Sequence, residues 1–145
     1  MCGLLASGMV FAQQGAQNES EKEFQEANLP GDGRPVFVIP IQGEIDRSLM
    51  VYVRRGILKA KAENASHIIF DIDTFGGRVD SALQITTLIG SLSDITTSAY
   101  VALRPEGTAV SWSAGALISF SCDQIYMAPG TSMGAAAPVI MSPEG

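Results

Sequence analysis

Apolar residues recur along the chain in short blocks that follow two different periods. Residues 36–41 (VFVIPI) and 67–73 (HIIFDID) are dense runs rich in β-branched residues, which are typical of strands. Residues 96–102 and 124–127 form two further strand-like runs. Because the run 67–73 is almost continuously apolar, we expect a parallel sheet to bury it on both faces. Pro40 predicts that the first strand lies at an edge of the sheet or near its own end.

Between these runs the apolar positions follow a helical period. A helix capped by Asp46 or Ser48 is predicted to end at about Asn64, and a second helix is predicted over residues 79–92. The first buries Leu49, Val53, Ile57 and Ala60, and the second buries Val79, Ala82, Leu83, Thr86 and Ile89. A third helix, rich in small residues, is predicted over residues 110–122. The order β-α-β-α-β-α-β predicts an α/β fold with a mostly parallel sheet and helices packed against it.

Length and charge limit the possible functions. A chain of 145 residues allows one domain, and a net charge of −6 argues against nucleic acid as a partner. Residues 1–12 are apolar but shorter than the ~20 residues that span a bilayer. We expect them to be the end of a signal peptide that starts upstream, or else an N-terminus without ordered structure. Residues 13–34 are expected to be a flexible linker, and residues 35–145 a domain truncated at its C-terminus.

A glycine pair follows the second strand. It belongs to residues 73–78 (DTFGGR), between a buried strand and a helix N-terminus. Glycine lets the backbone approach a substrate closely, so Gly76 and Gly77 can direct an N–H group at a developing oxyanion. The alternative is a tight β–α turn in which glycine is only convenient. Since the pair lies outside the apolar segments, we expect its substitution to affect folding less than the site.

A serine motif precedes the third helix, at residues 111–115 (SWSAG). The free N–H groups of a helix N-terminus favour a serine alkoxide or an oxyanion, and the N–H of Ala114 would be a second donor beside Ser113. Two alternatives remain open. Ser113 could be only a helix cap, and Ser111 could be the nucleophile or the cap.

A general base for this serine is missing from the sequence that follows it. No lysine or histidine comes after Ser113: the last lysine is Lys61 and the only histidine is His67. His67 stands at the end of its strand opposite the Gly-Gly loop, and Lys59 and Lys61 are expected at the same remote end. The base is therefore unidentified in this chain. Cys122, at the end of an apolar run, is expected to be a buried and inert thiol.

Two carboxylates alternate along the second strand. Asp71 and Asp73 would point to one face, but no histidine or further acidic residue joins them at metal-ligand spacing. We therefore expect a structural role and no metal, with Asp73 capping or bracing the Gly-Gly turn.

The order of these motifs carries a family resemblance. A strand, D-T-x-G-G, a helix, a strand, an S-A-G helix and then C-D-Q-I-Y-M-A-P-G-T-x-x-G-A-A resembles the Clp-protease/crotonase superfamily. More narrowly, residues 36–139 resemble the N-terminal serine-protease domain of the NfeD family. The strongest match is residues 125–131 (IYMAPGT). Phe75 stands where that family usually has proline, and Trp112 stands where it has a small residue.

The resemblance implies a fold and a set of residue roles. The fold is a Clp-protease/crotonase-like spiral of β-α units. Ser113 is the nucleophile, Gly76 and Gly77 form the oxyanion loop, and Ala114 gives the second amide. No cofactor is implied. The base is a lysine some tens of residues beyond the serine, so we expect the isolated chain to be inactive.

The resemblance also implies a setting: a membrane-anchored, extracytoplasmic and homo-oligomeric serine endopeptidase. Its partners would be stomatin-like membrane proteins or other hydrophobic peptide segments. Three alternatives remain. A signal-peptide-peptidase-like enzyme would share the dyad, and a crotonase-type acyl-CoA enzyme would use the same amides without Ser113. A non-enzymatic domain would serve to assemble membrane scaffolds.

Overall fold

The computed structural model describes residues 33–137. The expected signal segment and nearly all of the expected linker lie outside this range. The elements within it are β1 Val36–Ile45, α1 Arg47–Ala62, β2 His67–Gly77, α2 Val79–Gly90, β3 Thr96–Val101, β4 Val110–Trp112, α3 Ala114–Phe120, β5 Gln124–Met127 and β6 Ser132–Gly134. No helix among them is long and apolar enough to cross a bilayer.

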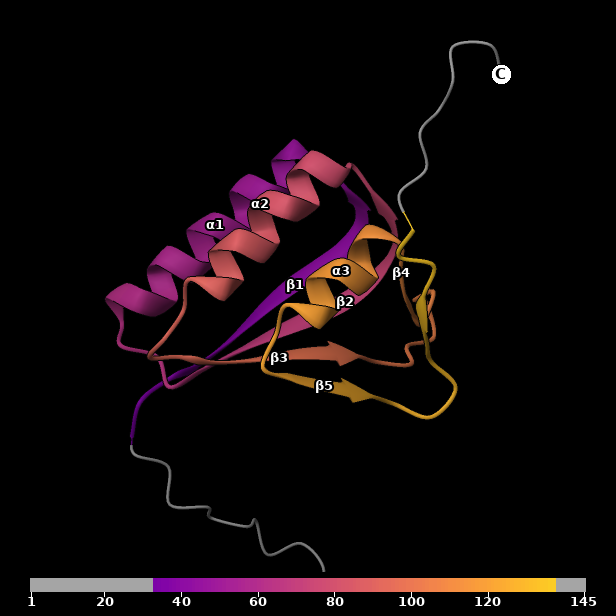
Figure 1. Ribbon diagram of the computed structural model, residues 1–145. Helices are drawn as coiled ribbons and strands as arrows, with labels where there is room; N and C mark the ends of the chain where they lie inside the picture. The colour runs from indigo at the N-terminus through magenta and orange to yellow at the C-terminus, as the bar shows by residue number, and fades with distance from the viewer. Residues whose placement is uncertain (1–32, 138–145) are drawn as a thin grey trace, which may run out of the picture. The chain divides into compact units, whose positions relative to one another are not determined.

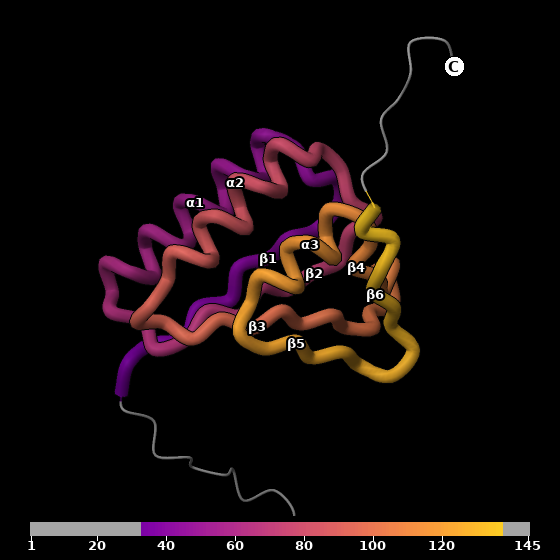
Figure 2. The backbone as a smooth tube through the Cα atoms, in the orientation of Figure 1, coloured from indigo at the N-terminus to yellow at the C-terminus, as the bar shows by residue number. Residues whose placement is uncertain are grey.

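Strand β2 is shared by two parallel sheets. It pairs with β1 along its whole length on one side, its first part pairs with β3 on the other side, and β3 pairs in turn with β5. Its C-terminal end pairs with β4 through Thr74 and Ser111, and β4 pairs with β6, so that a small second sheet lies beside the end of β2 (Figure 2). The predicted parallel sheet is confirmed, and β1 is an edge strand as Pro40 indicated.

The three helices lie on one face of the main sheet (Figure 1). As a result β2 is buried on alternate residues only: Ile68, Phe70 and Ile72 are inaccessible, whereas His67 and Asp71 are partly exposed. The expectation that both faces would be buried is therefore wrong. The apolar run of β2 shows that the strand is hydrophobic, but it does not show whether helices cover one face of the sheet or both. That depends on how the helices pack in the folded domain.

Helix packing corrects two of the predicted faces. Asp46 caps α1 by accepting from the Leu49 N–H at 2.8 Å, and the buried residues of α1 are Met50, Val53, Ile57 and Ala60. Helix α2 buries Ser81, Ala82, Ile85 and Ile89, whereas Val79 and Leu83 are exposed. Because α2 packs against both α1 and α3, its buried stripe is rotated from the one that hydropathy alone favours.

The third predicted helix begins too early. Residues 110–112 form β4, and α3 starts only at Ala114. Val110 and Ser111 are drawn into extended backbone because they pair with β6, a strand that the sequence pattern did not predict. Strand β5 lies where it was predicted.

Candidate functional site

Ser113 forms a sharp elbow between β4 and α3. Its backbone has φ 52° and ψ −118°, a conformation that side-chain-bearing residues seldom adopt. The Ser113 N–H donates to the carbonyl of Gly134 at 2.8 Å, which ties the elbow to β6. A strained strand-to-helix turn of this kind is how several hydrolases present a nucleophilic serine at the end of a sheet.

The Ser113 hydroxyl is uncommitted within the part of the chain that the structure describes. Ser113 stands at the cap position of α3, yet its side chain makes no capping hydrogen bond and has no other partner there. Ser111 is different: it is fully buried, and its Oγ lies 2.8 Å from the Oγ of Ser119. Of the two serines, Ser113 alone is partly exposed, so Ser113 is the one that could attack a substrate.

Gly76 lies directly against this serine. A Cβ on Gly76, whose φ is 113°, would stand 2.7 Å from Ser113 Cβ and 3.2 Å from the Ala114 nitrogen. Such contacts are too short for any side chain, so only glycine allows the loop to approach. The structure thus brings together Gly76, Ser113 and Ala114, three residues that the sequence placed in the candidate site.

The two glycines present different N–H groups. The Gly76 N–H donates to Thr74 Oγ1 at 2.9 Å and is already engaged. The Arg78 N–H donates to the carbonyl of Ile45 at 2.7 Å, and Ile45 is paired with Gly77. In this parallel pair Ile45 bonds to the residues on either side of Gly77, so the N–H of Gly77 itself faces away from β1. The Gly77 N–H therefore points away from β1, and it is the free candidate donor of the pair.

Gly77 also has a packing role. Its φ is 153°, and a Cβ there would lie 2.4 Å from the oxygen and 2.6 Å from the nitrogen of Ile45. Backbone atoms within a strand pair cannot retreat without breaking the pairing. The expectation that substitution in the glycine pair would affect folding less than the site does not fit the packing of Gly77.

Thr74 shapes the loop, a role that the sequence analysis missed. This residue is only 1% exposed, and its hydroxyl accepts from the Gly76 N–H and donates to the carbonyl of Gly43. Gly43 lies at an irregularity in β1, so the contact joins the loop to the neighbouring strand. A Cβ on Gly115 would stand 2.5 Å from the Thr74 methyl group, which shows how tightly α3 packs here. Thr74, rather than Asp73, braces the Gly-Gly turn.

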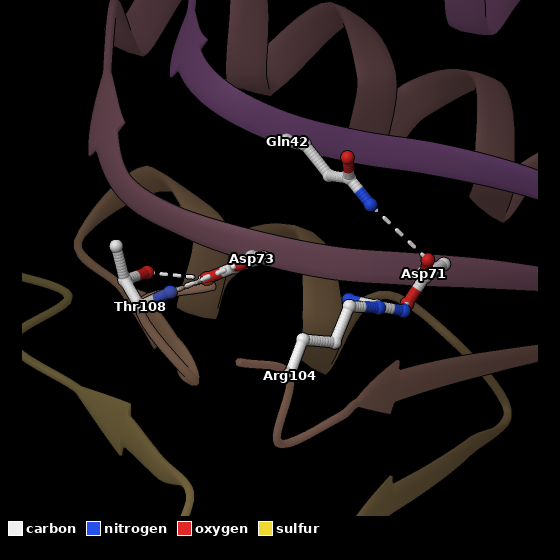
Figure 3. A network of polar contacts seen from close by, with 5 residues as sticks. All are labelled: Gln42, Asp71, Asp73, Arg104 and Thr108. Atoms are coloured by element: carbon white, nitrogen blue, oxygen red, sulfur yellow. Dashed lines mark hydrogen bonds and ion pairs between the residues drawn. The ribbon is translucent and has the colours of Figure 1, made fainter. Parts of the chain in front are cut away.

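The two aspartates fasten the loop that leads to β4 (Figure 3). Asp73 accepts hydrogen bonds from the backbone N–H of Thr108, at 3.0 Å, and from its hydroxyl. Asp71 pairs with Arg104 and accepts from Gln42 Nε2 at 3.2 Å. The Asp71 carboxylate, mainly through its hydrogen bond, raises the pKa of the Arg104 guanidinium. Both carboxylates are structural, as expected, although Asp73 holds a different segment from the one predicted.

The candidate bases lie far from the serine. His67 and Gly76 are nine residues apart on one strand, which corresponds to roughly 30 Å. His67 Nε2 is 2.7 Å from Ser98 Oγ, and Lys59 and Lys61 end the helix that leads back to His67. Cys122 is partly buried, not fully buried as expected, and this burial raises the pKa of its thiol to about 12, which keeps the thiol protonated at neutral pH.

Comparisons with known proteins agree with this arrangement. A family model described as "NfeD1b, N-terminal domain" matches residues 35–144. Membrane protein NfeD1b of Bacillus subtilis (strain 168) is 42% identical over 112 residues, which are 77% of this chain and 24% of that protein. The chain thus spans about a quarter of that relative's length.

Solved structures show the same fold. The 1510-N membrane-bound stomatin-specific protease of Pyrococcus horikoshii, solved as a serine-to-alanine mutant, matches with a TM-score of 0.66 and 36% identity. The match covers 76% of this chain and 52% of that one. The same protease was also solved as a lysine-to-alanine mutant in complex with a substrate peptide. ClpP1 from Listeria monocytogenes matches with a TM-score of 0.51 and 25% identity, over 59% of this chain and 46% of that one. The predicted Clp-protease-like fold is confirmed.

Proposed function

This chain belongs to the family of NfeD1b N-terminal domains, and from that membership we propose that it carries the nucleophile and the oxyanion loop of a serine endopeptidase. The observation that carries the proposal is the strained elbow at Ser113, whose uncommitted hydroxyl lies against Gly76. Backbone strain at a residue whose side chain makes no hydrogen bond is more typical of a functional site than of a packing position.

The proposed reaction proceeds through an acyl-enzyme. The Ser113 Oγ forms a bond to the scissile carbonyl carbon, and its proton passes to a neutral lysine. The N–H groups of Gly77 and Ala114 stabilise the oxyanion. The C–N bond then breaks, and the amine leaves with the proton from the lysine. Water next attacks the ester carbon and gives a proton to the lysine. The bond from that carbon to Ser113 Oγ breaks, Oγ regains the proton, and the second peptide leaves with a new carboxyl terminus.

The proton acceptor is proposed to be a lysine that is not among these 145 residues. A Ser–Lys arrangement is supported by the 1510-N protease, which was solved both as a serine-to-alanine and as a lysine-to-alanine mutant. Apolar surroundings would lower the pKa of such a lysine enough to leave it neutral.

We also propose the setting that the relatives suggest. The substrates are apolar segments of stomatin-like membrane proteins, a proposal supported by the 1510-N protease, which is stomatin-specific. The working protein is a homo-oligomer, anchored in a membrane with this domain on the extracytoplasmic side. Residues 1–12 are then the end of an export signal, and residues 13–34 a linker.

The test compares two serines in the whole protein that carries this chain. Ser113→Ala should abolish cleavage of an apolar peptide from a stomatin-like partner, whereas Ser111→Ala should retain most of it. Losing a nucleophile costs ~10⁶-fold in turnover, which any peptide assay resolves. Unchanged cleavage by a folded Ser113→Ala protein would refute the proposal and favour a role in assembly.

A further inference from the structure

An exposed aromatic pair flanks the serine elbow. Trp112 directly precedes Ser113, and Phe75 directly precedes Gly76, the glycine in contact with Ser113. The two ring centroids are 5.5 Å apart with an interplanar angle of 67°, an edge-to-face contact. Since consecutive Cα atoms are ~3.8 Å apart, the Cα atom that carries each ring is that distance from the Cα atom of Ser113 or Gly76.

Both rings lie on the face of the sheet that the described helices leave open. Phe75 alternates with Asp71 and Asp73 along β2, so its side chain shares their face, opposite α1, α2 and α3. The Trp112 indole N–H donates to Ser132 Oγ on β6 at 2.9 Å. This hydrogen bond orients the indole, and the edge-to-face contact then orients Phe75.

The pair contributes little to the core. Phe75 is 61% exposed and Trp112 is 39% exposed, although aromatic side chains stabilise a fold mainly by being buried. Two rings at this angle form an apolar corner between a ring face and a ring edge. An oriented apolar corner beside an uncommitted serine has the character of a binding subsite.

Resting on the proposed peptidase function, we infer that Phe75 and Trp112 form a specificity subsite for a large apolar side chain of the peptide, at a position next to the scissile bond. The occupant is a leucine-like or aromatic side chain, which gains by leaving water, whereas a charged group would lose hydration against the two apolar rings.

Binding can be measured without catalysis. Trp112 is the only tryptophan of the 145-residue chain, so its fluorescence reports on the subsite alone. The chain with Ser113→Ala is titrated with two blocked pentapeptides of alanine that carry leucine or serine at the centre. The leucine peptide should shift the emission to the blue and bind roughly tenfold more tightly, as expected for partial burial of one leucine side chain.

A matched pair of variants isolates the subsite. Phe75→Ala should remove the preference for leucine, whereas Phe120→Ala should keep it, because Phe120 is equally exposed, at 61%, but lies at the far end of α3. Equal affinity for the two peptides, or equal losses in the two variants, would overturn the inference. The inference would also be overturned if Phe75→Ala changed the oligomeric mass in light scattering but left the preference for leucine unchanged. That result would show that the aromatic pair is a subunit interface.

Cleavage by the whole protein separates this inference from the proposed function. If Ser113→Ala abolishes cleavage but Phe75→Ala leaves the ratio of kcat/KM for the two peptides unchanged, the subsite is refuted and the peptidase stands. If the leucine peptide binds at Trp112 but cleavage does not depend on Ser113, the proposed peptidase mechanism is refuted and the subsite stands.

Discussion

The hydroxyl of Thr74 is expected to hold the oxyanion loop in place, and Thr74→Val tests this directly. Valine matches threonine in shape but cannot bond to the Gly76 N–H or to the carbonyl of Gly43. Gly43 is exposed, so its carbonyl can turn to water, whereas Gly76 is buried and its N–H would be left without a partner. The relevant loss is therefore one unsatisfied buried donor.

An unsatisfied buried donor costs about 1–3 kcal/mol of unfolding free energy. For a domain of this size that corresponds to a fall in Tm of roughly 5–15 °C. Turnover should fall further, by ~100-fold or more, because the freed loop no longer directs the Gly77 N–H at the oxyanion. The two effects are measured separately, by thermal melts of the 145-residue chain and by peptide cleavage in the whole protein.

Thr74→Ser is the matched control. Serine keeps both hydrogen bonds and loses only the methyl group that packs against Gly115, which costs about 1 kcal/mol. It should melt slightly below the wild type and retain most of the turnover. If Thr74→Val melts and cleaves like the wild type, or if the two variants behave alike, the hydroxyl does not organise the loop.

Three further outcomes follow from the packing. Gly77→Val should prevent folding because its Cβ meets the backbone of Ile45, whereas Gly90→Ala, with open space around it, should melt like the wild type; circular dichroism compares them. Hydrogen bonds from Thr97 lower the pKa of Asp123, so its stabilisation is present above pH ~4 and is lost as the pH falls through the lowered pKa. Asp123→Asn should cost about 1 kcal/mol in urea unfolding at pH 7 and little at pH 2, and an equal loss at both values would contradict this. Cys122, with its pKa raised to about 12, should react with a thiol reagent at pH 8 only after unfolding, and rapid labelling of the native chain would show that the thiol is accessible.

Local sequence signals predicted the main elements well because they act over a few residues. The cap at Asp46 and the helical spacing of Val53 and Ile57 need no distant partner, and the apolar run at residues 124–127 shows the strand although its pairing with β3 does not appear in the sequence. The predicted helix over residues 110–122 failed at its start because β4 exists only through pairing with β2 and β6. The buried stripe of α2 was misplaced for a similar reason, since its neighbours α1 and α3 decide which face is covered.

The sequence by itself determined the α/β alternation, the glycine pair, the serine before a small-residue helix, and the remoteness of His67 and the lysines. Each of these depends on residue type and spacing along the chain. Only the tertiary structure decided that Ser113 rather than Ser111 is accessible, that Gly77 packs against Ile45, and that Thr74 braces the loop. These features depend on contacts between residues about 30 or more positions apart, or on which side of a strand is buried. A linear pattern cannot fix such contacts until the strands have taken their register.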